Sequence, residues 1–425
     1  MITIRRSKLQ GKVIAPPSKS VAHRAIICAS MASGKSVVRN VDFSEDILAT
    51  IDVMRAFGAE IECGEREVYI NNGIDLFLHG ENQLVPNDRV EPIIANCRES
   101  GTTLRMTIPL AMIINGGAKF VGKGRLMARP LDAYTELFDE CGVRYAKDDD
   151  YFYVGNHGAL RQTIRISGKV SSQYISGLLC YLPNLPEIEG GYCIEIIDGL
   201  ESRAYIDLTI NVLKNFGISV KNFDYKRFVV QGGQKFIARE YEVENDFSQA
   251  AFWLVARELG NDIEVEGLSV KSLQGDRRIV QILDDMFGVH EDNVKYIIDA
   301  REIPDLVPIL AVAGCFVNRE VDIINAERLR YKESDRLFAI ATELNNLGAK
   351  IEERDDGLLI KPIKKLSGGR VSSHNDHRIA MAIAIASTMC EGAIELEGED
   401  SVRKSYPRFW QEFKRLGGKI ETKNE

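Results

Sequence analysis

The stretch "VMRAFGAEIE", residues 53–62, contains the pattern that decides the fold. A run with helical spacing of apolar residues leads to Gly58, and a short alternating segment typical of a strand follows. A glycine at this point lets the chain leave a helix through a left-handed conformation that other residues adopt only at a steric cost. The segment predicts a helix that ends at Gly58 and reverses into a strand.

The same pattern of helix, glycine and strand recurs five more times along the chain. The copies lie around Gly142, Gly217, Gly288, Gly348 and Gly417. A hairpin-like pair of alternating runs follows, as in residues 59–71 and 349–361. One helix–glycine–strand phrase is common in α/β proteins, but six copies at similar spacing indicate an internal repeat.

The repeat also suggests how the chain divides. Three copies precede residues 229–236 and three follow them. A chain of 425 residues is longer than one compact core usually organises, so we expect two similar α/β domains of three units each. The first domain is expected at residues 19–240, and the second at residues 1–18 together with 241–425. Ligands of such proteins usually bind in the cleft between the domains.

The composition disfavours several classes of partner. The net charge is −8 and 45% of the residues are hydrophobic, so nothing in the overall charge attracts nucleic acid or an anionic membrane. The longest uncharged stretch, residues 306–318, is shorter than the roughly 18 residues of a membrane-spanning helix. The N-terminus has no signal-like apolar core, and the eight scattered cysteines form no CxxC pair. We therefore expect a cytoplasmic protein with reduced thiols.

The predicted helix starts combine residues that rarely occur together. In residues 15–30 two prolines precede Ser18, Lys19 and Ser20, and Arg24 follows on the same helix face as Ser20. Hydroxyl groups are ordinary N-caps, but a cation is disfavoured at the positive end of the helix dipole. Cations in the first turns therefore suggest that an anion binds beside the backbone amides.

Five further helix starts repeat this combination. Their polar residues are Ser100, Gly101, Thr102 and Arg105; Ser171, Ser172 and Gln173; Ser202 and Arg203; Lys332, Glu333 and Arg336; and Asp376, His377 and Arg378. One such start could be a solvated arginine beside an ordinary cap, but six together indicate a small substrate with several phosphate or carboxylate groups. His374 and His377 are three residues apart without a third ligand, so we expect no metal, and a structural or substrate-contacting His377.

Six motifs, in the same order along nearly the whole chain, give it a strong resemblance to a known family. They are "SKSVAHR" (18–24), "SGTTLR" (100–105), "RPLDAY" (129–134), "SSQY" (171–174), "RYKESDRLFAIATEL" (330–344) and "NDHRIAMA" (375–382). The chain resembles the enolpyruvyl transferases, and among them most closely the 3-phosphoshikimate 1-carboxyvinyltransferases, or EPSP synthases. The resemblance implies two inside-out α/β domains, each of three βαβαββ repeats, with the active site in the interdomain cleft.

The resemblance also implies a reaction. The enolpyruvyl group of phosphoenolpyruvate is transferred to the 5-hydroxyl of shikimate 3-phosphate, and phosphate leaves from a tetrahedral intermediate. The reaction belongs to the shikimate pathway, which leads to chorismate and the aromatic amino acids. We expect the protein to need no cofactor, to bind neither nucleic acid nor membrane, and to be a monomer.

The family's functional residues carry over motif by motif. For shikimate 3-phosphate they are Lys19, Ser20, Arg24, Ser171, Ser172, Gln173, Ser202, Asp305 and Lys332. For phosphoenolpyruvate they are Lys19, Gly101, Arg129, Gln173, Arg336, Arg378 and Lys404. Asp305 and Glu333 would form the acid–base pair, and Lys19 would touch both substrates. A carboxylate that faces anionic substrates should have a raised pKa, which favours a general acid near neutral pH.

The chain departs from the family pattern just before "SGTTLR". Arg98 and Glu99 stand where the family usually has Gly-Asn, so a carboxylate is expected near the phosphoenolpyruvate site. The nearest alternative is the sister family, the UDP-N-acetylglucosamine enolpyruvyl transferases. They usually carry a reactive cysteine five residues before the arginine that matches Arg129, and this position is Gly124 here.

A second alternative belongs to another class, a non-catalytic repeat protein or a nucleic-acid enzyme built on related α/β repeats. The net acidity and the lack of an interleaved basic and aromatic surface disfavour nucleic acid. A homologue without activity should have lost some of the residues Lys19, Asp305, Glu333 and Arg378, and all four are present. Phosphate release with each acceptor would discriminate among these alternatives.

Overall fold

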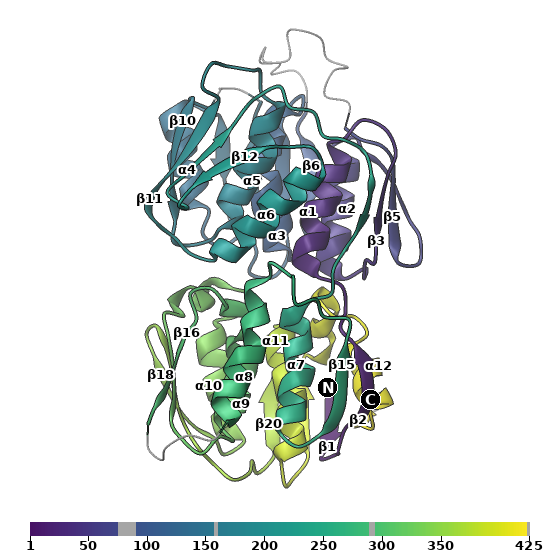
Figure 1. Ribbon diagram of the computed structural model, residues 1–425, viewed down its shortest axis with the longest axis vertical. Helices are drawn as coiled ribbons and strands as arrows, with labels where there is room; N and C mark the ends of the chain where they lie inside the picture. Colours follow the sequence, from purple (N-terminus) through teal and green to yellow (C-terminus); the bar gives the residue numbers. More distant parts are fainter. Residues whose placement is uncertain (75–90, 157–159, 289–293, 423–425) are drawn as a thin grey trace. The chain divides into compact units, whose positions relative to one another are not determined.

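The computed structural model describes residues 1–74, 91–156, 160–288 and 294–422 (Figure 1). The chain forms two compact units, which we call the first unit (Pro17–Glu244) and the second unit (Met1–Pro16 with Asn245–Glu425). The division expected from the sequence runs after residues 18 and 240, whereas the units divide after residues 16 and 244.

Strand pairing explains where the first unit ends. β14 (Glu240–Glu242) pairs in parallel with β3 (Ser36–Arg39), so the returning chain stays with the first unit past residue 240. Ser18 N then donates to Glu244 O over 2.7 Å within the first unit. In the second unit, Asp246 N donates to Pro16 O over 2.8 Å. Each unit thus ties the outgoing segment of the chain to the returning one.

The described residues of the first unit form three four-stranded sheets with one pairing pattern, in which one parallel pair is extended by two antiparallel strands. Their orders are β14-β3-β5-β4, β6-β7-β9-β8 and β10-β11-β13-β12. The remaining strands are β4 (Glu60–Cys63), β5 (Glu67–Asn72), β6 (Ile93–Asn96), β7 (Ala118–Val121), β8 (Tyr145–Lys147), β9 (Tyr151–Val154), β10 (Thr163–Gly168), β11 (Tyr192–Leu200), β12 (Val220–Phe223) and β13 (Arg227–Val230).

The helices of the first unit form its interior. They are α1 (Lys19–Ser30), α2 (Glu45–Ala56), α3 (Gly101–Thr107), η1 (Pro109–Ile113), α4 (Asp132–Cys141), α5 (Gln173–Tyr181), η2 (Leu182–Asn184) and α6 (Arg203–Asn215). α1 buries every residue from Val21 to Ser30, because small and apolar side chains surround its axis. Strands such as β3 and β5 alternate buried with half-buried residues, as outer sheets do. Figure 1 shows the helices of this unit with sheets on their outer side.

The second unit repeats this plan. Its sheets have the orders β16-β17-β19-β18, β20-β21-β1-β22 and, among the described residues, β15-β2. Its strands are β1 (Ile2–Arg5), β2 (Gln10–Ile14), β15 (Asp262–Glu266), β16 (Tyr296–Asp299), β17 (Val321–Ile324), β18 (Lys350–Arg354), β19 (Gly357–Lys361), β20 (Gly369–Ser372), β21 (Ile394–Glu397) and β22 (Lys419–Thr422). Its helices are α7 (Phe247–Glu258), η3 (Gly275–Arg278), α8 (Ile279–Phe287), η4 (Pro304–Leu306), α9 (Val307–Gly314), η5 (Glu327–Tyr331), α10 (Arg336–Asn346), α11 (His377–Ala386), η6 (Ser387–Met389), η7 (Glu399–Lys404) and α12 (Phe409–Arg415).

The predicted βαβαββ repeats and inside-out units are confirmed. One repeat of the first unit runs β10-α5-β11-α6-β12-β13, and its counterpart in the second unit runs β16-α9-β17-α10-β18-β19. The helices α9 and α11 are buried along their whole length, so the inside-out arrangement holds in the second unit as well.

The repeat glycines behave as predicted at five of the six positions. Their φ angles are positive, from 66° at Gly142 to 109° at Gly58. Gly288 contradicts the prediction with a φ of −63°. Gly288 is itself the C-cap of α8, extended with a ψ of 171°, and its amide makes the helical bond to Asp284 O over 3.0 Å. The rest of that copy, residues 289–292, lies outside the described residues.

Candidate active site

In the first unit, hydrogen bonds link the first turns of α1, α3, α5 and α6. We call their polar residues, with the supporting Arg129, the first cluster. It comprises Lys19, Ser20, Arg24, Gly101, Thr102, Arg105, Arg129, Ser171, Ser172, Gln173 and Ser202. All of these positions were singled out from the sequence, and the contacts below show how they are held.

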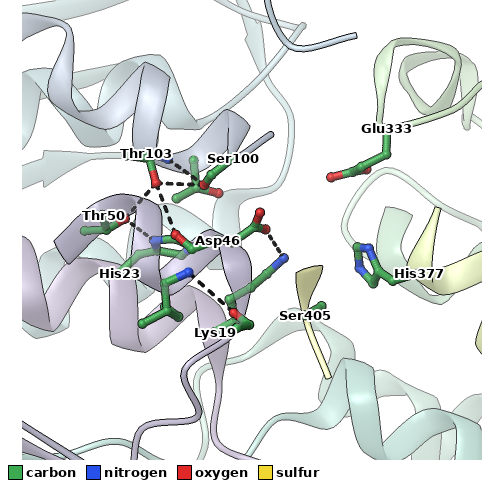
Figure 2. Close-up of polar contacts among 12 residues, drawn as sticks. Lys19, His23, Asp46, Thr50, Ser100, Thr103, Glu333, His377 and Ser405 are labelled. Carbon is green, nitrogen blue, oxygen red and sulfur yellow. Dashed lines mark hydrogen bonds and ion pairs between the residues drawn. The ribbon is translucent and has the colours of Figure 1, made fainter. Parts of the chain in front are cut away.

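α1 begins with a capped turn that presents Lys19. Ser18 is the N-cap, and its Oγ accepts from Val21 N over 3.4 Å. Lys19 Nζ lies 2.5 Å from Asp46 Oδ2 on α2 (Figure 2). The Lys19 side chain keeps 17% of its surface exposed. Asp46 could not be predicted as the partner of Lys19, because it lies 27 residues away in an ordinary first helical turn.

Arg24 is buried among neutral oxygen atoms, with 2% of its surface exposed. Its Nε donates to Thr209 Oγ1 over 2.7 Å, and its terminal nitrogens donate to the carbonyl oxygens of Ser20 and Tyr205 over 2.8 and 3.2 Å. Burial lowers the pKa of this guanidinium. Among the described residues no carboxylate pairs with Arg24, so its positive charge adds to the field of the first cluster.

Two more guanidinium groups lie against the start of α3. A Cβ atom on Gly101 would lie 2.6 Å from Arg129 Nη1 and 3.3 Å from Arg105 Nη1, so only glycine leaves room for both groups. Arg105 Nη1 donates to Gln173 Oε1 over 3.1 Å, and Gln173 Nε2 donates to Thr102 Oγ1 over 2.8 Å. Gln173 therefore joins the starts of α5 and α3. Arg105 was noted in the sequence as a helix-start cation but received no role.

The serines of the first cluster stand at the starts of α5 and α6. Ser171 Oγ accepts from Gln173 N over 3.2 Å, and Ser172 occupies the N-cap position without a side-chain cap bond. Ser202 is 3% exposed and has a φ of 56°, a left-handed conformation in a residue other than glycine. Such a conformation costs about 1–2 kcal/mol. Backbone strain of this kind gathers at ligand-binding positions.

The second unit gathers its helix starts around one guanidinium group. We call Asp305, Lys332, Glu333, Arg336, Asp376, His377, Arg378 and Lys404, with Ser248, the second cluster. Arg336 is 2% exposed and binds three carboxylates. The distances are 2.8 Å to Asp305 Oδ1, 2.7 Å to Glu333 Oε2 and 2.8 Å to Asp376 Oδ2.

Arg378 fixes the other side of Asp305. Its terminal nitrogens donate to Asp305 Oδ2 over 3.0 Å, to the Asp305 carbonyl over 3.1 Å and to Ser248 Oγ over 3.0 Å. Asp376, fully buried, caps α11 by accepting from Arg378 N over 2.9 Å while it binds Arg336. The sequence marked Asp376 as a helix-start residue, but its link to Arg336 spans 40 residues and left no signal.

The charges of the second cluster shift one another's protonation. Burial favours the neutral form of Asp305, but Arg378, Lys332 and Arg336 together hold its pKa well below the usual range. The protein's own groups thus shift the pKa of Asp305 in the direction opposite to that expected for a carboxylate facing anionic substrates, because three cations face it. Burial lowers the pKa of Lys332 to about 8. For Arg336 burial opposes the charge, yet Asp376, Glu333 and Asp305 raise its pKa.

Lys404 and His377 complete the second cluster. Lys404 Nζ donates to Asn375 O over 2.7 Å, and His377 Nδ1 lies 3.8 Å from Asp376 Oδ1. His374 instead pairs with Glu343, with 2.7 Å between Nε2 and Oε1. Within residues 1–74, 91–156, 160–288 and 294–422, no group of three His, Cys, Asp or Glu side chains is placed to hold a metal ion.

The residues that depart from the family pattern have their own partners. Arg98 binds Asp52 over 2.8 Å and also Glu45, which directs its charge toward α2. A Cβ atom on Gly124, where φ is 59°, would lie 2.9 Å from the carboxyl carbon of Glu99. A cysteine at residue 124, as in the sister family, would be strained and would collide with Glu99.

Both units are built from α/β repeats and gather cations and carboxylates at their helix starts. The family model for EPSP synthase (3-phosphoshikimate 1-carboxyvinyltransferase) matches residues 4–413. The chain belongs to this family.

Similar proteins agree with this assignment. A 3-phosphoshikimate 1-carboxyvinyltransferase of Clostridium perfringens is 44% identical over 430 residues, which cover 98% of both chains. One from Clostridioides difficile is 43% identical over 441 residues, which cover 100% of this chain and 99% of the relative. The solved structure of EPSP synthase from Acinetobacter baumannii matches with a TM-score of 0.77 over 99% of each chain, at 24% identity, and supports the fold. None of the described helices is long and apolar enough to cross a membrane.

Proposed function

We propose that residues of both clusters carry out the reaction of this family. The enzyme is a 3-phosphoshikimate 1-carboxyvinyltransferase, which transfers the enolpyruvyl group of phosphoenolpyruvate to the 5-hydroxyl of shikimate 3-phosphate and releases phosphate. The observation that carries the residue assignment is Arg336, which is buried between Asp305, Glu333 and Asp376. Two carboxylates beside one fixed cation suit a reaction that moves a proton twice.

We assign shikimate 3-phosphate chiefly to the first cluster. The residues are Lys19, Ser20, Arg24, Ser171, Ser172, Gln173 and Ser202, joined by Asp305 and Lys332 of the second cluster. The support is electrostatic, because Arg24 and Arg105 have only neutral oxygen partners among the described residues and helix starts add positive potential. A phosphate group would supply the missing negative charge.

Phosphoenolpyruvate is assigned to cations of both clusters. The residues are Lys19, Gly101, Arg129 and Gln173 of the first cluster and Arg336, Arg378 and Lys404 of the second. Gly101 belongs to this group because its missing side chain lets Arg129 lie against the backbone. These cations stabilise negative charge on the phosphate while the tetrahedral intermediate forms and collapses.

The proton transfers follow from the charges of the second cluster. Asp305 is ionised at neutral pH, so it takes the proton of the 5-hydroxyl as that oxygen bonds to C2 of phosphoenolpyruvate. Glu333, beside the same Arg336, gives a proton to the methylene carbon, which becomes a methyl group. In the elimination a methyl proton returns to Glu333, the C–O bond to phosphate breaks and the C=C bond re-forms, while the leaving phosphate takes the proton held by Asp305, so both carboxyl groups return to their starting forms. The proton balance needs no cofactor.

Two coarser properties belong to the proposal as well. The enzyme is proposed to act in the cytoplasm, since all eight cysteines are free thiols. It is also proposed to act as a monomer, because each unit encloses its own hydrophobic core. Gel filtration with light scattering tests the second statement, and a mass of twice 47.5 kDa would contradict it.

The experiment that tests the function mixes the purified protein with phosphoenolpyruvate and either shikimate 3-phosphate or UDP-N-acetylglucosamine. Phosphate release is followed in each case. We expect phosphate release when the acceptor is shikimate 3-phosphate and none when it is UDP-N-acetylglucosamine. Release with the nucleotide sugar alone would assign the chain to the sister activity despite Gly124, and no release with either acceptor would refute the proposal.

The residue roles are tested with Asp305→Asn and Glu333→Gln. Each should lower kcat by about 10²- to 10⁴-fold, the usual contribution of a general acid or base. Asp299→Asn is the matched control, because Asp299 is a surface carboxylate that pairs with Arg301 outside the cluster. A folded Glu333→Gln enzyme with normal turnover would remove Glu333 from the mechanism.

A further inference from the structure

Behind the first cluster, hydrogen bonds connect the buried side chains of His23, Thr50, Thr103 and Ser100, which we call the relay. His23 Nδ1 lies 2.6 Å from Thr50 Oγ1, and Thr50 Oγ1 lies 2.7 Å from Thr103 Oγ1. Thr103 Oγ1 in turn donates to Ser100 Oγ over 2.7 Å. All four side chains are completely buried, and Figure 2 shows them connected in this order. Three helices contribute, because His23 lies on α1, Thr50 on α2 and Thr103 on α3.

The number of hydroxyl hydrogens determines which group donates in each hydrogen bond of the relay. Each threonine hydroxyl has one proton to donate. Thr103 is the donor in its contact with Ser100, whereas the Asp46 carbonyl at 3.4 Å is beyond the normal O–H···O range. Thr50 must then donate to Thr103, and the remaining contact requires His23 Nδ1–H to donate to Thr50. If Thr103 donated to Thr50 instead, Thr50 would donate to His23 Nδ1 and the ring proton would sit on Nε2, which is buried without a partner among the described residues. The relay therefore demands one tautomer of His23, with the proton on Nδ1.

The surroundings of His23 keep it neutral. Burial, Lys19 and Arg24 hold the pKa of His23 well below its usual range. A second proton would sit on Nε2, which is buried and has no hydrogen-bond partner among the described residues. The neutral Nδ1–H form thus satisfies the relay and leaves Nε2 as an acceptor. Because the imidazole of His23 is held in one tautomer, it fixes one end of the relay.

The relay connects two parts of the proposed phosphoenolpyruvate site. At one end, His23 lies one helical turn after Lys19. At the other end, Ser100 caps α3, whose first residue is Gly101. The cap itself is a bond from Thr103 N to Ser100 Oγ of 3.1 Å. The same hydroxyl that anchors the cap therefore also ends the relay.

We propose that His23 is a positioning residue, which sets the place of the Gly101 backbone relative to Lys19. It acts through Thr50 and Thr103 and touches neither substrate. The inference rests on the proposed function, because Lys19 and Gly101 are assigned there to phosphoenolpyruvate. Losing the relay should therefore weaken phosphoenolpyruvate binding more than binding of shikimate 3-phosphate, because Gly101 is assigned to phosphoenolpyruvate alone and the residues assigned to shikimate 3-phosphate lie outside α3.

The first test measures the tautomer directly and does not depend on the reaction. The chain has six histidines, so selective ¹⁵N-histidine labelling gives a spectrum that can be assigned by a His23→Asn variant. The ring of His23 should carry its proton on Nδ1, with an unprotonated Nε2. A wild-type protein with the proton on Nε2 would overturn the relay, whatever its activity.

The second test compares two variants of Thr50. Thr50→Val keeps the shape of the side chain and removes the hydroxyl, whereas Thr50→Ser keeps the hydroxyl. Thr50→Val should raise KM for phosphoenolpyruvate by about tenfold, as expected for the loss of one buried hydrogen bond, with KM for shikimate 3-phosphate within about threefold. Thr50→Ser should keep both KM values near those of the wild type.

A pair of His23 variants adds a conservative rescue. The amide nitrogen of asparagine can replace Nδ1–H, so His23→Asn should retain the low KM for phosphoenolpyruvate. Glutamine reaches toward the Nε2 position instead, so His23→Gln should resemble Thr50→Val. If the thermal midpoint falls in Thr50→Val while both KM values stay unchanged, the relay is only structural and the proposal is wrong. If the wild-type enzyme releases no phosphate, the proposed function fails, and the tautomer measurement still decides the relay.

Discussion

The two clusters are built on the same repeat but treat a buried guanidinium group in opposite ways. Arg24 and Arg336 are equally buried, with 2% of each exposed. Arg24 is surrounded by hydroxyl and carbonyl oxygens, whereas Arg336 binds three carboxylates. The pKa of Arg24 is lowered by burial, and that of Arg336 is raised by its carboxylates despite burial. Equal burial therefore leads to opposite electrostatics.

The difference matches two chemical tasks. A buried cation without a carboxylate partner keeps its attraction for an incoming anion, which suits the binding of phosphate. A cation balanced by several carboxylates holds those carboxylates in fixed positions, which suits proton transfer. The repeat supplies the helix starts, and the residues on the helix starts decide which task each unit performs.

The largest expected effect comes from removing each guanidinium group in turn. Arg336→Met leaves three carboxylates facing one another in a buried site and should lower the free energy of unfolding by about 3–5 kcal/mol. Arg24→Met leaves neutral oxygens without a donor and should lower it by about 1–3 kcal/mol. Urea unfolding at pH 7 measures both losses, and equal losses would contradict the comparison.

A surface arginine provides the control for this pair. Arg354 pairs with Asp322 and Glu352, but its side chain is 36% exposed. Arg354→Met should cost less than about 1 kcal/mol, as exposed ion pairs do. If Arg354→Met cost as much as Arg336→Met, the loss would come from ion pairing in general rather than from burial of the second cluster.

An intermediate effect is expected where the first cluster has its tightest packing. The Cβ atom of Gly101→Ala would lie 2.6 Å from Arg129 Nη1, so the guanidinium group must move away. We expect KM for phosphoenolpyruvate to rise by about 10- to 30-fold through lost binding, with a smaller change in KM for shikimate 3-phosphate. Steady-state kinetics with each substrate varied checks this. Gly64→Ala is the control. Its Cβ atom would lie nearest the movable ring of Tyr69, at 3.1 Å, and in ordinary contact with Glu67 O at 3.6 Å.

The fold could be predicted because its signals are local in sequence. Each repeat places a helix, a glycine and a strand within about ten residues, and the glycine conformations confirmed it at five positions. The prediction failed at Gly288 because this glycine is itself the C-cap of α8 and leaves the helix in an extended conformation, which the residues up to 288 do not indicate. The helix-start cations were equally readable, since each lies within a turn of its cap.

The partners of those cations could not be predicted. Arg336 meets Asp376 across 40 residues, and Arg378 meets Asp305 across 73. These contacts reverse the expected direction of the pKa shift of Asp305, since that direction depends on cations brought together by the fold. Asp46 and the relay from His23 to Ser100 could not be predicted either. Their partners are also distant in sequence, and threonine and aspartate have many ordinary roles in helices.

The smallest expected effect concerns Lys332, where burial outweighs the attraction of Asp305 and lowers the pKa from 10.5 to about 8. Between those pH values the unfolded chain binds a proton at Lys332 that the folded chain does not. The wild type therefore gains stability as the pH rises from about 8 to 10.5. Lys332→Met has no such group, so it should be more stable than the wild type at pH 7 by about 1–2 kcal/mol, a discounted estimate from the shift. That advantage should disappear near pH 10.5.

Lys361→Met, at an exposed position of β19, is the control and should show no pH-dependent difference in stability from the wild type. Urea unfolding midpoints at both pH values measure the difference for each variant. A Lys332→Met protein that is less stable than the wild type at pH 7 would mean that the carboxylates of the second cluster stabilise this lysine as they do Arg336.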